Sequence, residues 1–283
     1  MKRILVIILG SLLLTAAIAA QDQSEINTIL MRSTFKLQGK GAVGTAFLLG
    51  KPSKADPAKA FYVLVTAAHV LDACEGNDAT LILRTKEPAG FARAPITIKI
   101  REAGHPLWVK HPKADVAAMY ISIPSKADVQ LVTTELLADD NILTKYEVHP
   151  GDQVKCLGYP YGFEANEEGF AILRNATIAS YPIVPTSASK PILLDFNVQE
   201  GNSGGPAYFV DYNRMYGGTV NIGSVRFLMG LVSQQSFIEE EVRSINEIRK
   251  ERHQLGLAVI VPAVAIKECI AMLPNEPTIA KGG

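Results

Sequence analysis

Residues 199–208 read QEGNSGGPAY and hold three glycines, one proline and one serine. Glycine and proline interrupt helices and strands, so this stretch predicts a tight turn rather than an ordinary core segment. Its serine, Ser203, is either a plain turn residue or a nucleophile presented by that turn. The letters GNSGG also satisfy G-x-S-x-G, the nucleophile elbow of folds that alternate strands and helices. The rest of the chain must distinguish these possibilities.

The chain around this turn predicts an all-β fold. From Thr34 to about Val232 it shows short β-branched and aromatic runs broken by turn residues, which indicates a barrel or sandwich. Examples are GTAFLLG (44–50), AFYVLVTA (60–67) and VAAMYISI (116–123). Helical periodicity appears in three places, which are 24–33, 237–254 and 263–273. We therefore expect a leading helix, an inserted helix near 237–254 and a C-terminal helix.

A seryl oxygen needs a base to take its proton, and the base needs a carboxylate to orient it. His69 ends an apolar strand, and Asp115 opens another, so the order along the chain is His69, Asp115, Ser203. An elbow serine is instead followed by its acid and then its base. After Ser203 the chain offers only His253, in a highly charged segment, so the elbow reading is disfavoured. His111 and Asp72 are weaker alternatives as base and acid.

Five motifs in this order resemble the trypsin-like, chymotrypsin-fold serine peptidases, particularly the bacterial secreted and HtrA-like branch. They are VTAAHVL (65–71), ADVAAMYI (114–121), GNSGGPAY (201–208), GLVSQQ (230–235) and GLAVIVP (256–262). The resemblance implies two packed six-stranded antiparallel β-barrels. It implies one peptidase domain over 34–275, with the division between barrels near 125–145. The PDZ domain of the HtrA-like relatives has no counterpart in the sequence.

The resemblance also implies a role for each matching residue. His69 would be the general base and then the acid, Asp115 would orient it, and Ser203 would attack the peptide carbonyl. The backbone N–H groups of Gly201 and Ser203 would form the oxyanion hole. The implied substrate pocket comprises Asn197, Val198, Ser233, Gln235 and Gly256. Ser233 is further expected to hydrogen-bond either Asp115 or the substrate backbone.

Two positions depart from the digestive enzymes of this family. Asn202 replaces an aspartate that pairs with a newly cut N-terminal amine, and a neutral amide cannot form that charge-assisted bond. Activation by N-terminal insertion is therefore not expected. Asn197 replaces the aspartate of the trypsin pocket, so a preference for Lys or Arg is not supported. We expect small or medium uncharged side chains to be accepted.

The N-terminal sequence indicates the cellular compartment, and the charge balance limits the kinds of partner. Residues 1–20 have a basic start, an apolar run and small residues before a polar segment, which predicts a cleaved secretory signal rather than an uncleaved anchor. The protein is then secreted or periplasmic, with no stable membrane span after cleavage. Basic and acidic residues balance at 28 each, so no basic field favours nucleic acid.

Cysteine usage and the implied chemistry give no reason to expect a cofactor. Cys74, Cys156 and Cys269 are widely spaced, which argues against a metal cage and leaves open one disulfide or three buried thiols. We expect a serine endopeptidase with a polypeptide substrate and neither metal nor organic cofactor. Two alternatives remain, a catalytically silent binding or scaffold protein and an esterase with the same triad. The segment 236–254 either caps the barrel or contacts a protein partner beside the cleft.

Overall fold

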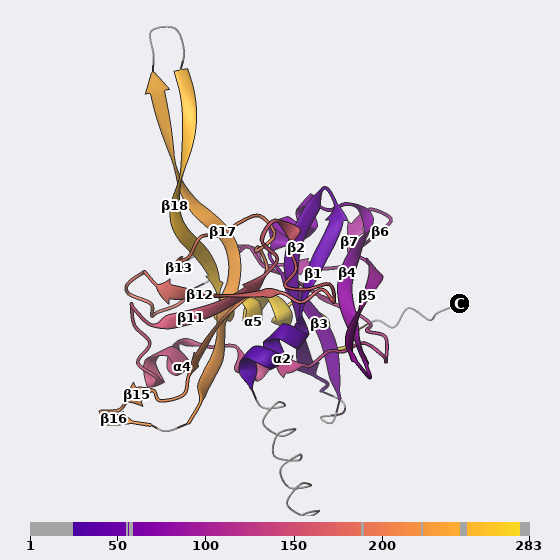
Figure 1. Ribbon diagram of the computed structural model, residues 1–283, viewed down its shortest axis with the longest axis horizontal. Helices are drawn as coiled ribbons and strands as arrows, with labels where there is room; N and C mark the ends of the chain where they lie inside the picture. Colours follow the sequence, from indigo (N-terminus) through magenta and orange to yellow (C-terminus); the bar gives the residue numbers. More distant parts are fainter. Residues whose placement is uncertain are drawn as a thin grey trace, which may run out of the picture.

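The computed structural model describes residues 25–54, 56, 59–187, 190–221, 223–243 and 248–277, with only the backbone for 235–243 and 248–253. The predicted signal peptide, 1–20, lies outside the described residues. Figure 1 shows two β-rich halves side by side, with the N-terminal half in indigo and purple and the C-terminal half in magenta to yellow. A long two-stranded arm projects from the second half. The chain is therefore mostly β, as predicted.

The N-terminal half contains one large sheet, in which all described pairs are antiparallel apart from one. Its hydrogen-bonded order is β5–β4–β1–β2–β3–β9–β8, with β10 pairing in parallel with β2. The strands are β1 (Thr34–Lys40), β2 (Ala42–Pro52), β3 (Ala60–Thr66), β4 (Glu75–Glu87), β5 (Gly90–Lys99), β8 (Val109–Lys110), β9 (Ala117–Tyr120) and β10 (Val132–Thr133). A separate pair is β6 (Arg101–Glu102) and β7 (His105–Pro106).

The C-terminal half closes into a six-stranded antiparallel barrel. Its order is β11–β12–β13–β18–β17–β14. The strands are β11 (Gln153–Gly158), β12 (Ile172–Ile178), β13 (Ile192–Asp195), β14 (Pro206–Asp211), β17 (Val225–Arg243) and β18 (Ile248–Pro262), with a small outer pair formed by β15 (Met215–Tyr216) and β16 (Thr219–Val220). Because the barrel is closed, each of its six strands pairs with a neighbour on both sides.

The prediction of two six-stranded barrels is correct for the C-terminal half alone. The main sheet of the N-terminal half has eight described strands, and its two end strands, β5 and β8, do not pair with each other. A barrel closes only when its two end strands hydrogen-bond to each other. The alternation of apolar residues that indicates strands contains no information on that closure.

The prediction of a helix over 237–254 is wrong. Strands β17 and β18 continue through this segment as an antiparallel ladder that pairs Phe237 with Gln254 and ends with Arg243 opposite Ile248. Both strands leave the barrel already paired at Val232 and Ile260, so each further pair closes no new loop. Helix propensity is a weak preference that such pairing overrides. The result is the projecting arm of Figure 1.

Short helices cover the ends of the two halves. They are α2 (Ile26–Ser33), α3 (Ala68–Ala73), α4 (Asp140–Lys145) and α5 (Ala263–Ala271), with 3-10 turns η1 (Thr134–Leu136) and η2 (Pro160–Gly162). The leading helix and the C-terminal helix were both predicted. Side chains from α2 and α5 pack in the larger apolar core with residues of both halves, such as Phe47 and Leu231. Among the described residues no helix is long and apolar enough to cross a membrane.

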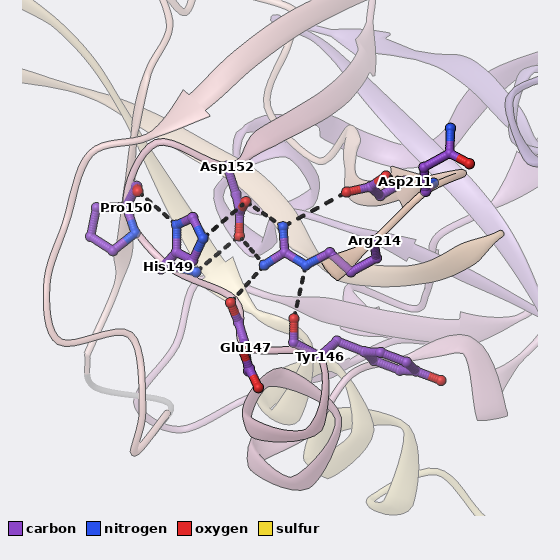
Figure 2. Close-up of polar contacts among 8 residues, drawn as sticks. Tyr146, Glu147, His149, Pro150, Asp152, Asp211 and Arg214 are labelled. Carbon is purple, nitrogen blue, oxygen red and sulfur yellow. Dashed lines mark hydrogen bonds and ion pairs between the residues drawn. The ribbon is translucent and has the colours of Figure 1, made fainter. Parts of the chain in front are cut away.

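A buried ionic cluster fastens one end of the barrel (Figure 2). Arg214 Nη1 and Nη2 donate to the two carboxylate oxygens of Asp152, at 2.5 and 2.8 Å. Its Nε and Nη2 also donate to the carbonyl oxygens of Tyr146 and Glu147, at 2.9 and 2.6 Å. Hydrogen bonding to Asp152 raises the pKa of Arg214 above its ordinary value. The cluster thereby joins the loop after β14 to the loop before β11.

Candidate active site

The turn that contains Ser203 lies between β13 and β14 and requires glycine at two positions. Gly201 has φ +91°, and a Cβ there would lie 2.1 Å from the carbonyl oxygen of Tyr159. Gly204 has φ +87°, and a Cβ there would lie 2.1 Å from the carbonyl oxygen of Thr45. Such distances exclude any side chain, and both φ values favour glycine. The glycines therefore allow the turn to pack directly against neighbouring backbone.

Five successive carbonyl groups of this turn each accept a hydrogen bond, which fixes the orientation of their peptide planes. The acceptors and donors are Gln199 O from Asn202 N at 3.1 Å, Glu200 O from Tyr161 N at 2.6 Å, Gly201 O from Thr45 Oγ1 at 2.7 Å, Asn202 O from Gly205 N at 3.0 Å, and Ser203 O from Thr45 N at 2.8 Å. Because a peptide unit is planar, fixing a carbonyl also fixes the N–H group of the next residue.

Four N–H groups of the turn at 199–205 have no hydrogen-bond acceptor among the described residues, those of Gln199, Glu200, Gly201 and Ser203. Of these, the N–H groups of Gly201, which is buried, and of Ser203 lie in the motif around the serine. The peptide before each is held by Tyr161 and Gly205, respectively. An unpaired buried N–H group is costly, so such a pair indicates a place for an external oxygen. Two fixed donors beside a serine hydroxyl have the chemistry of an oxyanion hole.

His69 and Asp115 meet beside this turn. His69 is the second residue of α3, and the imidazole Nδ1 lies 2.6 Å from Asp115 Oδ2, while the backbone N–H of His69 donates to Asp115 Oδ1 at 2.9 Å. Because an ionised carboxylate only accepts, the neutral ring carries its proton on Nδ1. The Nε2 lone pair is then available as a base, and the histidine side chain is 49% exposed.

A third hydrogen bond to Asp115 comes from Ser233 on β17. Ser233 Oγ donates to Asp115 Oδ2 at 2.5 Å, which is one of the two contacts that the sequence suggested for this serine. Partial burial of Asp115 favours its neutral form, but hydrogen bonds from His69 and Ser233 outweigh that effect and lower the pKa of Asp115 to about 2. The carboxyl group is therefore ionised at neutral pH.

The Ser203 hydroxyl is engaged with the same strand. Ser203 Oγ donates to the carbonyl oxygen of Ser233 at 2.8 Å. Within the described part of the chain no hydrogen bond joins Ser203 to the His69 ring. To transfer its proton to His69, the Ser203 hydroxyl must first leave this carbonyl. Catalytic hydrogen bonds are often long or absent before substrate binds, so this arrangement is compatible with a nucleophilic role.

A cavity of about 430 Å³ brings these groups together. It is lined by His69, Asp115, Val198, Gln199, Glu200, Ser203, Ser233 and Gln234. Two of the expected pocket residues, Val198 and Ser233, are in this lining. Gln199, Glu200 and Gln234 were not expected from the sequence, although each neighbours an expected residue.

Two other expected pocket residues are outside this lining, and the side chain of a third is not described. Asn197 and Gly256 lie beside one another, since a Cβ at Gly256 would be 3.3 Å from Asn197 Oδ1, and neither is among the described residues that line the cavity. The side chain of Gln235 lies outside the described residues. Asn197 is held through its carbonyl oxygen, which accepts from Arg174 Nη1 at 2.8 Å.

The weaker alternatives for base and acid have other partners. His111 Nδ1 accepts the N–H groups of Lys113 and Ala114, at 3.2 and 3.0 Å, and its Nε2 lies 2.9 Å from Glu268 Oε2. Asp72 forms an ion pair with Lys110. His111 is therefore a buried structural residue of the loop that leads to Asp115.

The three cysteines are free and buried. Burial raises the pKa of Cys156 to about 12 and that of Cys269 to about 11, and it also raises the pKa of Cys74. Thiols held in this way are poor nucleophiles. Of the two possibilities left by the sequence, the structure shows the buried thiols.

Sequence comparison identifies neither a protein-family model nor a curated protein that matches this chain. Structure comparison finds a distant similarity to Rv3671c of M. tuberculosis H37Rv. A serine-to-alanine mutant of that protein in an inactive form is 18% identical, with a TM-score of 0.43, and 86% of each chain is covered. The structure described as the Rv3671c protease in an inactive form is also 18% identical, with a TM-score of 0.44, and the match covers 86% of this chain and 89% of that one.

Proposed function

We propose that this protein is a serine endopeptidase that uses His69, Asp115 and Ser203. The observation that carries the proposal is the turn at 199–205, whose held carbonyls leave the N–H groups of Gly201 and Ser203 free beside the Ser203 hydroxyl. The His69 and Asp115 pair lines the same cavity as that hydroxyl. The motif order along the sequence supports the same assignment.

In the proposed reaction His69 Nε2 takes the hydroxyl proton while Ser203 Oγ attacks the carbonyl carbon of the substrate. The resulting oxyanion accepts hydrogen bonds from the Gly201 and Ser203 N–H groups, and each such donor is typically worth ~2.7–4 kcal/mol in the transition state. His69 then gives the proton to the leaving amine, which leaves an acyl ester on Ser203. Water, deprotonated by His69, hydrolyses that ester and restores the hydroxyl.

The substrate is proposed to be a polypeptide bound along the cavity. Val198, Gln199, Ser233 and Gln234 offer apolar contact and neutral polar groups there. These four residues support small or medium uncharged side chains at the cleavage site, while Glu200 adds one carboxylate to the lining. The projecting arm starts beside Ser233 and Gln234, so the proposed protein partner at 236–254 would lie beside the cleft. The sequence of residues 1–20 supports secretion or a periplasmic location.

Two alternatives use the same geometry. A silent binding or scaffold protein would be favoured by the Ser203 hydroxyl, which donates to Ser233 rather than to His69. An esterase would share every catalytic group and differ only in substrate.

Labelling with a fluorophosphonate probe distinguishes these functions. Purified wild type should react at Ser203 and cleave casein, while Ser203→Ala should do neither. Labelling without casein cleavage would favour the esterase or a highly selective peptidase. Folded wild type that remains unlabelled, with circular dichroism equal to that of Ser203→Ala, would contradict the enzyme proposal.

A further inference from the structure

Thr45 on β2 contacts the Ser203 turn from the opposite half of the molecule. It is fully buried, its hydroxyl donates to the carbonyl oxygen of Gly201 at 2.7 Å, and its N–H donates to that of Ser203 at 2.8 Å. These two carbonyls belong to Gly201 and Ser203, the residues whose N–H groups are the candidate oxyanion donors. Thr45 therefore fixes the peptide on the C-terminal side of both candidate oxyanion donors.

Of the five donors to the turn carbonyls, only the Thr45 hydroxyl belongs to a side chain. The other four hydrogen bonds come from the backbone N–H groups of Thr45, Tyr161, Asn202 and Gly205. It acts on the carbonyl of Gly201, a residue without a Cβ that has the widest choice of backbone conformation. Without the hydroxyl, the buried Gly201 carbonyl would lose its donor. The Gly201–Asn202 peptide would then have to rotate for this carbonyl to reach another donor.

Thr66 extends this contact toward His69. Its hydroxyl donates to the carbonyl oxygen of Thr45 at 2.7 Å, and both threonines are fully buried. Thr66 is the last residue of β3, three positions before His69. A Cβ on Gly204 would lie 2.3 Å from Thr66 Oγ1, so the turn packs tightly against this pair. Two buried hydroxyls thus connect the strand that leads to His69 with the turn that presents Ser203.

We propose that Thr45 is a positioning residue that holds the Gly201 and Ser203 N–H groups in the orientation that binds an oxyanion, and that Thr66 supports it. The inference rests on the proposed peptidase function. It assigns part of the oxyanion hole to the N-terminal sheet, although both N–H donors belong to the C-terminal half.

The test compares Thr45→Val with Thr45→Ser, using steady-state cleavage of a peptide substrate. Valine keeps the shape and removes the hydroxyl, whereas serine keeps the hydroxyl. Removing an oxyanion donor outright lowers kcat by ~10²–10³-fold, so displacing one through Thr45→Val should lower kcat by roughly tenfold or more, with KM nearly unchanged. Thr45→Ser should restore most of the activity. Thr97→Val, at an exposed position of β5, is the matched control and should match wild type.

A purely structural role predicts a different result. Thr45→Val would then lower the melting temperature while the kcat of the folded protein stayed at the wild-type value, and this outcome would overturn the inference. If Thr45→Val does not fold, Thr66→Val replaces it, with a smaller loss of kcat expected because the Thr45 hydroxyl remains. Unchanged kcat in folded Thr66→Val would then overturn the inference.

Crystal structures separate failure of this inference from failure of the proposed function. If wild type is inactive and unlabelled, kinetics cannot address Thr45, but the orientation of the Gly201 carbonyl in Thr45→Val can. A rotated Gly201–Asn202 peptide would support the positioning role. An unchanged turn would overturn it, whatever the activity of the wild type.

Discussion

At the scale of single residues, Asp115 carries the clearest electrostatic signature. Its two carboxylate oxygens accept from the His69 backbone, the His69 ring and Ser233. Partial burial favours the neutral carboxyl group, but these hydrogen bonds are stronger to the ionised form and lower the pKa of Asp115 to about 2. Folding therefore favours the charged form, and the contribution of Asp115 to stability depends on pH.

We predict a pH-dependent difference in stability between wild type and Asp115→Asn. A group whose pKa is lowered on folding stabilises the protein above its unfolded pKa, and this contribution is lost as pH falls through the folded value. The wild-type advantage should be constant above pH ~4 and shrink by up to about 2 kcal/mol as the pH falls toward and below 2. Urea unfolding of both proteins at several pH values measures it. A difference independent of pH would show that the carboxylate is not held by these contacts.

The residues that set the turn differ in how far the sequence predicts them. Ser203 and the glycines around it form a short motif that is visible in the sequence. His69 and Asp115 are also recognisable, because each lies at one end of an apolar run that predicts a strand. Thr45 gives no such signal, because its hydroxyl bonds to a carbonyl 156 positions away and threonine is common in strands. Gln199 and Glu200 line the cavity from the turn, and Gln234 lines it from β17, where the register of its pairing with β18 shifts. Residue types alone do not specify these backbone features.

At the scale of elements, the loop over 159–170 connects the Ser203 turn to the N-terminal sheet. The Tyr161 N–H holds the Glu200 carbonyl at 2.6 Å, which orients the peptide that carries the Gly201 N–H. Further along the loop, Glu164 forms ion pairs with Lys36 on β1 and Arg93 on β5. The glutamate and lysine side chains are each only 12% exposed. The first half of the loop is thus held both to the Ser203 turn and to the N-terminal sheet.

We predict that Glu164→Gln lowers kcat several-fold and changes KM little. Glutamine keeps the size of the side chain but removes the charge that holds Lys36 and Arg93, so the loop should hold Glu200 less firmly. Glu167→Gln makes the same chemical change at an exposed position of this loop and serves as the control. Peptide cleavage kinetics of both variants give the comparison. Equal kcat values in the two variants would exclude a role for the ion pairs.

The arm shows where pattern-based prediction fails for an element. Its residues suit one face of a helix almost as well as a strand, and no local feature distinguishes the two. The deciding interaction is the pairing of β17 with β18 inside the barrel, which the chain continues outward. The C-terminal helix is predictable from local sequence because an apolar periodic stretch follows the last barrel strand and ends before Pro274.

Replacing residues 237–254 with an Asn-Gly turn tests the proposed role of the arm. The barrel should remain closed, because pairs such as Leu231 with Val261 and Val232 with Ile260 are retained. We therefore expect cooperative thermal unfolding and unchanged labelling of Ser203. The profile of cleaved peptides should change, since the arm begins beside Ser233 and Gln234 in the cavity. The same profile before and after deletion would leave the arm without a role in selectivity.

At the scale of the whole molecule, the candidate catalytic groups come from both halves. His69 and Asp115 belong to the N-terminal half, while Ser203 and Ser233 belong to the barrel. One apolar core includes residues of both halves, and Thr45 and Glu164 add polar contacts across the same boundary. The geometry of the site therefore depends on each half keeping its own shape. In the barrel, a buried ion pair between Asp152 and Arg214, which do not line the cavity, contributes to that shape.

We predict that Asp152→Asn destabilises the protein by about 3 kcal/mol. The Arg214 side chain is 7% exposed and that of Asp152 is 8% exposed, so removing the carboxylate leaves the buried guanidinium with the longer ion pair to Asp211, at 3.8 Å. Glu102→Gln, whose exposed ion pair with Lys99 is 3.5 Å long, is the control and should have little effect. Urea unfolding gives both free energies. Because neither Asp152 nor Arg214 lines the cavity, folded Asp152→Asn should label at Ser203 at the wild-type rate. A stability equal to that of Glu102→Gln would mean that the buried pair contributes no more than a surface one.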